Sequence, residues 1–130
     1  MIFADASALI VLMTGEAEAD TLAETLESGG ERLCSALSIW ETVAGLCRSY
    51  QYTTDSARAD VQDYLKLERF RIVPIGVAEY EIAASAYARF GKGRHPAGLN
   101  MGDCFAYACA RTNQAKLLYK GSYFDKTDLA

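Results

Sequence analysis

Three carboxylates stand where acidic side chains from distant parts of the chain could share one site. Asp5 follows the apolar residues 1–4, Glu41 lies near the start of a predicted helix, and Asp103 comes three residues after Asn100. Three carboxylates within a few ångströms repel one another, and a divalent cation removes that conflict. Oxygen ligands with few histidines or thiolates favour Mg²⁺ or Mn²⁺ over zinc. The chemistry that this set predicts is attack on a phosphodiester by a water that the metal activates.

Each acid also has a purely structural interpretation. Asp5 is well suited to cap a helix, and Asn100 with Asp103 has the spacing of a capping box. The segment Ser38-Ile-Trp-Glu41 has the order S-x-x-E of the same motif. From the residues alone, capping and metal binding both stay open for all three acids.

Short strands alternate with helices along the chain. The pattern predicts strands at 1–4, 33–36, 70–75 and 116–119, and helices at 6–13, 16–28, 38–50, 56–68, 77–90 and from Asn100 onward. Such alternation indicates an α/β fold, with a central, mostly parallel sheet of four to five strands and helices on both faces. Sites in such sheets form beyond the carboxyl ends of the strands, so the three acids are expected on one rim.

Composition limits the class of protein. With 130 residues, 51% of them hydrophobic, residues 1–130 are expected to form a single domain with a real core. There is no apolar run of about 20 residues to span a membrane, and the N-terminus lacks the basic start of a signal peptide, so we expect a cytoplasmic protein. The four cysteines match no zinc spacing and are expected to be core thiols.

The net charge of −4 does not by itself favour nucleic acid, so phosphate contacts would need local basic residues or bound cations. The loop at 91–98 carries Lys92, Arg94 and His95, which either solubilise the surface or position a phosphate. Ser7 has no partner histidine nearby in the sequence, and the chain contains no G-x-S-x-G motif of a serine nucleophile. It contains no dinucleotide-binding or P-loop motif either. The aromatic set Tyr80, Tyr87 and Phe90 is expected in a helix core, and Trp40 on the buried stripe of its helix.

Four segments carry a resemblance to a known family. They are MIFADASAL at the start, SALSIWE at 35–41, GKGRHPAGLNMGDCFAYACA at 91–110 and LLYKGSYFDKTDL at 117–129. In this order they resemble the PIN domain, and specifically the VapC-type toxins of bacterial toxin–antitoxin pairs. The resemblance implies a Mg²⁺- or Mn²⁺-dependent ribonuclease that cuts a structured RNA such as tRNA or rRNA. It also implies a homodimer that a VapB-type antitoxin inhibits.

The resemblance assigns roles to particular positions. Asp5 and Asp103 match metal ligands, and Glu41 matches an acid that binds the metal or holds a water. Ser7 and Asn100 match positions that support the site by hydrogen bonds. Ser122 is a further candidate for support, and the weak candidates for substrate contacts are Lys92, Arg94, His95 and Lys120.

One departure from the family concerns its fourth acid, which usually follows the Lys-Gly pair by one or two residues. Ser122 and Tyr123 stand there instead, and Asp125 or Asp128 further on is a candidate replacement. Asp128, in Thr-Asp-Leu, is itself a usual feature of the family, so a structural role also stays open for it. Three carboxylates predict one strongly bound ion. Two alternatives stay open: a catalytically weakened PIN scaffold that acts through antitoxin binding, and a Mg²⁺-dependent phosphohydrolase with a small substrate.

Overall fold

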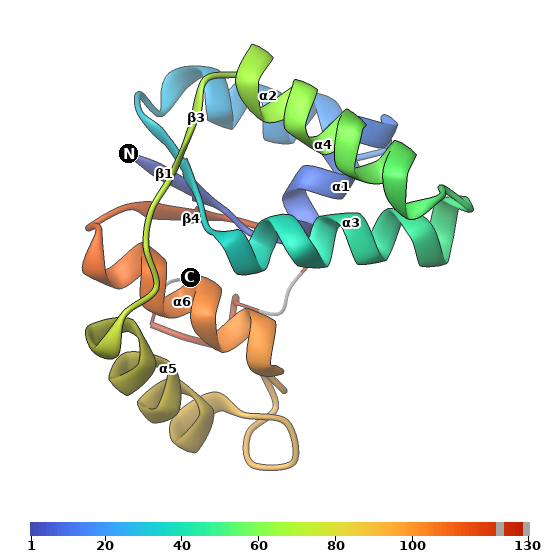
Figure 1. The fold of residues 1–130 in the computed structure, drawn as a ribbon. Helices are drawn as coiled ribbons and strands as arrows, with labels where there is room; N and C mark the ends of the chain where they lie inside the picture. The colour runs from blue at the N-terminus through green and yellow to red at the C-terminus, as the bar shows by residue number, and fades with distance from the viewer. Residues whose placement is uncertain (122–123, 129–130) are drawn as a thin grey trace.

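The computed structural model describes residues 1–121 and 124–128 and has a parallel four-stranded sheet at its centre (Figure 1). The strands are β1 (Ile2–Ala4), β2 (Arg32–Cys34), β3 (Phe70–Ile72) and β4 (Lys116–Leu118), in the order β3-β2-β1-β4. The register of β1 pairs Phe3 with Leu33 of β2 and with Leu117 of β4. The predicted α/β class is confirmed, although each strand is shorter than the sequence pattern indicated.

Six helices surround the sheet in the described part of the chain. They are α1 (Ala6–Thr14), α2 (Ala19–Ser28), α3 (Ala36–Tyr50), α4 (Thr54–Leu67), α5 (Val77–Phe90) and α6 (Met101–Thr112). Helices α5 and α6 lie on one side of the sheet, and α2 and α4 lie on the other (Figure 1). Nothing in residues 1–121 and 124–128 forms a helix of the length and apolarity that crossing a membrane requires.

The central strand β1 is buried on both faces, because successive side chains of a strand point to opposite sides. Phe3 packs into the core that α5 and α6 cover, whereas Ile2 joins the apolar cluster of α1 and α2. Ala4 joins a third cluster, formed with α1, α3 and α4. With both faces filled by apolar packing, the polar chemistry is left to the edge where β1 ends and α1 begins.

The start of α3 differs from the prediction. Ser35 is the N-cap and forms a capping box with Ser38, so the box predicted between Ser38 and Glu41 is wrong. The amide of Ser38 donates to Ser35 Oγ over 3.1 Å, and Ser38 Oγ accepts from the amide of Ser35 over 2.8 Å. Since the helix begins two residues earlier than predicted, Glu41 falls inside it and has no capping role.

Several aromatic side chains predicted in the core are exposed. Trp40 is 66% exposed, because α3 packs inward through the face that carries Ser38, Thr42 and Leu46, and Trp40 lies on the opposite face. Tyr80 and Tyr87 are 60% and 44% exposed, since α5 packs through alanines and Phe90. All four cysteines are free thiols; Cys34, Cys104 and Cys109 are buried as predicted, and Cys47 is half-buried.

Candidate active site

Asp5 occupies the turn from β1 into α1. It is the N-cap of α1, and its Oδ2 accepts a hydrogen bond from the amide of Ser7 over 3.0 Å. The side chain is only 5% exposed, and burial raises the pKa of Asp5 even though the hydrogen bonds from Ser7 and Ala6 lower it. Asp5 is therefore both a cap and a buried carboxyl group whose ionised form needs a positive partner.

Asp103 lies in the first turn of α6 and forms the predicted capping box. Its amide donates to Asn100 Oδ1 over 2.9 Å, and its Oδ2 accepts from the amide of Asn100 over 3.0 Å. Burial, together with the charge of Asp5, raises the pKa of Asp103 to about 6, although the hydrogen bond from Asn100 lowers it. The structural interpretation of Asp103 is correct, and the carboxylate still carries an unfavourable charge interaction with Asp5.

Glu41 reaches the other two acids from the second turn of α3. Its carboxylate lies against Gly102 of α6, in the space that a Cβ atom at position 102 would fill. Burial, then the charges of Asp5 and Asp103, raise the pKa of Glu41 to about 7. The structure thus brings three acids, from α3, from the N-cap of α1 and from the first turn of α6, within electrostatic reach of one another.

The donor set of this acidic cluster is made of oxygen atoms only, which suits a hard divalent cation. The absence of a side chain at Gly102 leaves the Glu41 carboxylate free to lie at the start of α6. Within residues 1–121 and 124–128, however, no three His, Cys, Asp or Glu side chains are spaced to hold an ion in their present rotamers.

Ser7 ties the beginning of α1 to the segment after β4, because its Oγ accepts a hydrogen bond from the amide of Lys120 over 3.0 Å. The Lys120 side chain points to a different partner and forms an ion pair of 2.5 Å with Glu16 Oε1. Tyr50, the last residue of α3, donates from its hydroxyl to the other oxygen of the same Glu16 carboxylate. Ser122, predicted to support the site, lies outside the described residues, as does Tyr123.

Two of the three basic-type side chains in the loop that leads into α6 contact the loop itself or α5. His95 Nδ1 accepts from the amide of Ala97 over 3.0 Å, and its ring meets Phe90 edge-on with centroids 5.2 Å apart. The Arg94 guanidinium lies 5.0 Å from the centre of the Tyr87 ring. Lys92 is exposed. These residues lie next to α6 along the chain, and their role as substrate contacts stays a prediction.

Asp125 and Asp128, considered as replacements for the family's fourth acid, each have a partner elsewhere. Asp125 accepts from the Tyr119 hydroxyl over 2.6 Å. Asp128 accepts from the Tyr107 hydroxyl over 2.6 Å and forms ion pairs with Arg89 and Arg111. Asp128 therefore fastens the C-terminal segment to α5 and α6, which agrees with the structural role considered for it.

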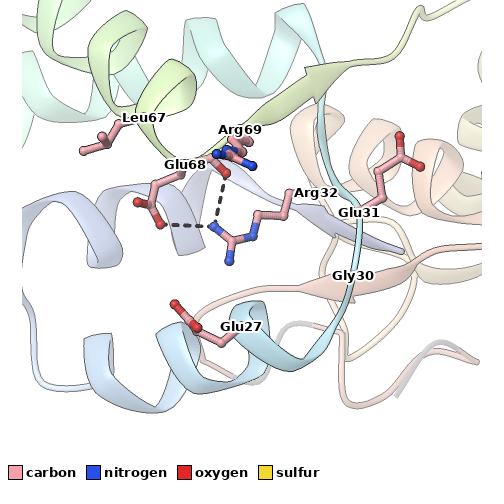
Figure 2. Close-up of a pocket in the computed structure, with 7 residues that line it drawn as sticks. All are labelled: Glu27, Gly30, Glu31, Arg32, Leu67, Glu68 and Arg69. Carbon is pink, nitrogen blue, oxygen red and sulfur yellow. Dashed lines mark hydrogen bonds and ion pairs between the residues drawn. The ribbon is translucent and has the colours of Figure 1, made fainter.

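A pocket of about 440 Å³ lies at the opposite edge of the sheet, where β2 and β3 begin (Figure 2). The Arg32 guanidinium points toward Glu68 and donates to its backbone oxygen and to its Oε1, both over 3.1 Å. This ion pair neutralises the Glu68 carboxylate and joins the start of β2 to the end of α4. The pocket is remote from the acidic cluster, and the ion pair that lines it links the segments that precede β2 and β3.

Sequence reasoning missed two participants around the site. Gly102 is a glycine inside a predicted helix, a signal that often has a packing reason. Glu16 was predicted only as the first residue of a helix, but it lies in the loop before α2 and binds both Tyr50 and Lys120.

A parallel sheet with acids clustered where its central strand ends is consistent with the matching family model, that of the PIN domain, over residues 2–129. Ribonuclease VapC of Mycolicibacterium smegmatis is 34% identical over 97% of this chain and 95% of its own length. A VapC ribonuclease of Rhizobium meliloti is 36% identical over 99% of both chains. The chain belongs to the PIN-domain family, among the VapC ribonucleases.

The fold comparison agrees with the sequence comparisons. The crystal structure of Mycobacterium tuberculosis VapC20, described as a sarcin-ricin loop cleaving toxin, superimposes with a TM-score of 0.75 at 19% identity. The match covers 96% of this chain and 93% of that one. At this level of identity the likeness concerns the fold alone.

Proposed function

We propose that this protein is a metal-dependent endoribonuclease, the toxin of a type II toxin–antitoxin pair, and that Asp5, Glu41 and Asp103 form its hydrolytic site. The observation that carries the proposal is the meeting of these acids at the start of α6, where burial raises all three pKa values and repulsion between the acids adds to the shifts of Glu41 and Asp103. Membership of the VapC ribonucleases supports RNA as the substrate.

Asp5 and Asp103 are the proposed direct ligands of a Mg²⁺ or Mn²⁺ ion, because they lie deepest at the helix starts. When bound, such an ion would offset the carboxylate charge, attract the substrate phosphate and make water more acidic. Glu41 is proposed to hold the attacking water, to take a proton from it and to return that proton to the leaving oxygen. The N-termini of α1 and α6 add positive potential where the phosphate would lie.

Ser7 and Asn100 are proposed to support the site by hydrogen bonds rather than to react. Ser7 donates its amide to Asp5 and accepts from the amide of Lys120, and Asn100 fixes the rotamer of Asp103. Lys92, Arg94, His95 and Lys120 are the proposed contacts to RNA phosphates outside the acidic cluster. Their positive charge is needed locally, because the chain as a whole is negative.

The proposed partners are a structured RNA such as tRNA or rRNA, a second copy of the chain, and a VapB-type antitoxin whose tail covers the acidic cluster in the cytoplasm. Exposed apolar side chains on α3 and α5, among them Trp40, Tyr80 and Tyr87, offer surface for the protein partners.

The direct test is to incubate total bacterial RNA with the purified protein in Mn²⁺, in Mg²⁺ and in EDTA. We expect discrete fragments with a divalent ion, none in EDTA, and recovery when excess Mn²⁺ is added back. Intact RNA under all conditions would contradict the proposal and favour a scaffold that acts only by binding its antitoxin. Hydrolysis of small phosphate esters without RNA cleavage would favour a small-substrate phosphohydrolase.

A further inference from the structure

A groove of about 390 Å³ lies between α1, the C-terminal end of α3 and the segment after β4. Its polar side chains are those of Ser7, Glu16, Ser49, Tyr50 and Lys120. We call it the Glu16 groove. Ile10 and Val11 of α1 form its apolar part.

The Glu16 groove adjoins the acidic cluster. Ser7 lines the groove and donates its amide to Asp5, so the groove begins beside that carboxylate. At its other end, Tyr50 lies nine residues after Glu41 on the same helix, which corresponds to about 13 Å at the usual rise per residue. An extended RNA strand with its scissile phosphate at the acidic cluster would cover this distance in a short stretch.

The groove holds one group suited to a phosphate and two suited to a base. The Lys120 ammonium, 48% exposed, can turn from Glu16 to a phosphate. The Tyr50 ring is 40% exposed and offers a face on which a base can stack. The Glu16 carboxylate can only accept hydrogen bonds, and the hydrogen bonds from Lys120 and then from Tyr50 hold its pKa below the usual value, so it stays ionised.

Resting on the ribonuclease function proposed above, we propose that the Glu16 groove is a nucleotide subsite that selects guanine. Tyr50 stacks on the base, Lys120 binds its phosphate, and the two oxygens of Glu16 accept hydrogen bonds from the base edge. Guanine alone among the four RNA bases presents two adjacent N–H donors on its Watson–Crick edge, at N1 and N2, which match the two carboxylate oxygens.

The ion pair between Lys120 and Glu16 then has a role in the free protein. It neutralises a carboxylate that would otherwise repel RNA, and it is exchanged on binding for a lysine–phosphate pair and a glutamate–guanine pair. The competing explanation is a structural one, in which the three side chains only tie the end of α1 to the end of α3. If the cluster is a subsite, cleavage should depend on the identity of the base and on the Tyr50 ring. If its role is structural, cleavage should not depend on the base, and loss of the Tyr50 hydroxyl should be as harmful as loss of the ring.

The experiment measures kcat/KM for Mn²⁺-dependent cleavage of a single-stranded RNA oligonucleotide, after sequencing of the cleavage ends has located any preferred guanine. A matched oligonucleotide carries inosine at that position, which removes only the N2 amino group. We expect wild type to lose about 10-fold on inosine, within the range of a bidentate base contact. Glu16→Gln should cleave the two oligonucleotides equally, whereas Glu24→Gln, an exposed control on α2, should keep the wild-type difference.

Tyr50 and Lys120 provide the second arm. Tyr50→Phe keeps the ring and should cleave the guanine oligonucleotide within about 3-fold of wild type, whereas Tyr50→Ala should lose about 10-fold, as expected for a stacked base. Lys120→Gln should raise KM about 10-fold, whereas Lys116→Gln, at the opposite edge of the sheet, should leave it unchanged. Thermal melts accompany each variant.

Cleavage by wild type without a guanine preference, or a preference that survives in Glu16→Gln, would overturn the subsite and leave the ribonuclease function standing. Equal losses in Tyr50→Phe and Tyr50→Ala, with equally lowered melting temperatures, would also overturn it and assign the cluster to the structural role. If wild type cleaves no RNA with any divalent ion, the ribonuclease function and the subsite fall together.

Discussion

The carboxylate of Glu41, on α3, lies in the space that the missing side chain of Gly102, on α6, leaves open. This contact is what brings the third acid to Asp103, because Glu41 has no capping bond to hold it there. A glycine in a helix costs about 1 kcal/mol of stability relative to alanine. Its presence in the first turn of α6 fits a position where any side chain would exclude the Glu41 carboxylate.

We therefore predict that Gly102→Ala leaves the fold intact and removes most of the RNA cleavage, by about 10-fold or more. The new methyl group would meet the mobile end of the Glu41 side chain, which can turn away at little cost, while the helix gains up to about 1 kcal/mol. Thermal melts and cleavage rates measure both effects. In the double variant Gly102→Ala/Glu41→Ala, activity should equal that of Glu41→Ala alone, because both changes remove the same group. Additive losses would show that Gly102 acts in another way.

The pKa values of Glu41 and Asp103 predict how stability depends on pH in the absence of metal. The folded protein holds these protons up to about pH 7 and pH 6, whereas the unfolded chain releases them near 4.5 and 3.8. Between about pH 4 and pH 7 the folded state therefore binds more protons, and the free energy of unfolding falls as pH rises. Melting temperatures in EDTA should decline across this window, and Glu41→Gln should show a shallower decline. A metal-free protein that becomes more stable from pH 5 to pH 7 would contradict these shifts.

Divalent cations should reverse that trend. Because an ion binds the ionised carboxylates, Mg²⁺ or Mn²⁺ should raise the melting temperature more at pH 8 than at pH 5. With three carboxylates at the site, we expect isothermal titration calorimetry to show one strongly bound Mn²⁺ per chain. Asp5→Asn should weaken that binding by at least 10-fold. Two tight sites in the wild type would contradict the one-ion prediction.

We also predict a homodimer. Between α5 and α6 lies an apolar groove of about 280 Å³ lined by Tyr80, Tyr87, Met101 and Phe105, among others. Such a surface is more typical of an interface than of a solvated face. Sedimentation velocity across micromolar concentrations should show a dimer, and Tyr80→Glu should shift it toward the monomer. Only monomer in the wild type would count against this prediction.

Where a residue's role was set by its immediate neighbours, the sequence was a good guide. The capping box of Asn100 and Asp103 and the bounds of the helix at 77–90 were predicted correctly, because spacing and local propensity determine them. The start of α3 was not, because Ser35 and Ser38 both precede an apolar helix and the position where β2 ends decides between them.

Contacts between distant segments lie beyond such reasoning. The approach of Glu41 to Gly102 and the joining of Glu16 to Lys120 depend on how α1, α3 and α6 pack, which no local pattern encodes. The exposure of Trp40 has the same origin, since a large apolar side chain predicts burial only until the packed face of its helix is known.

The central claim, that the acidic cluster performs RNA hydrolysis, is tested most directly by Asp103→Asn. Asparagine can still accept the hydrogen bond from Asn100 and cap α6, so the melting temperature should stay close to that of wild type. The negative charge is lost, so we predict that the rate of Mn²⁺-dependent cleavage of a labelled RNA falls by at least 100-fold. Cleavage at the wild-type rate by a folded Asp103→Asn protein would return Asp103 to a capping role alone and contradict the account.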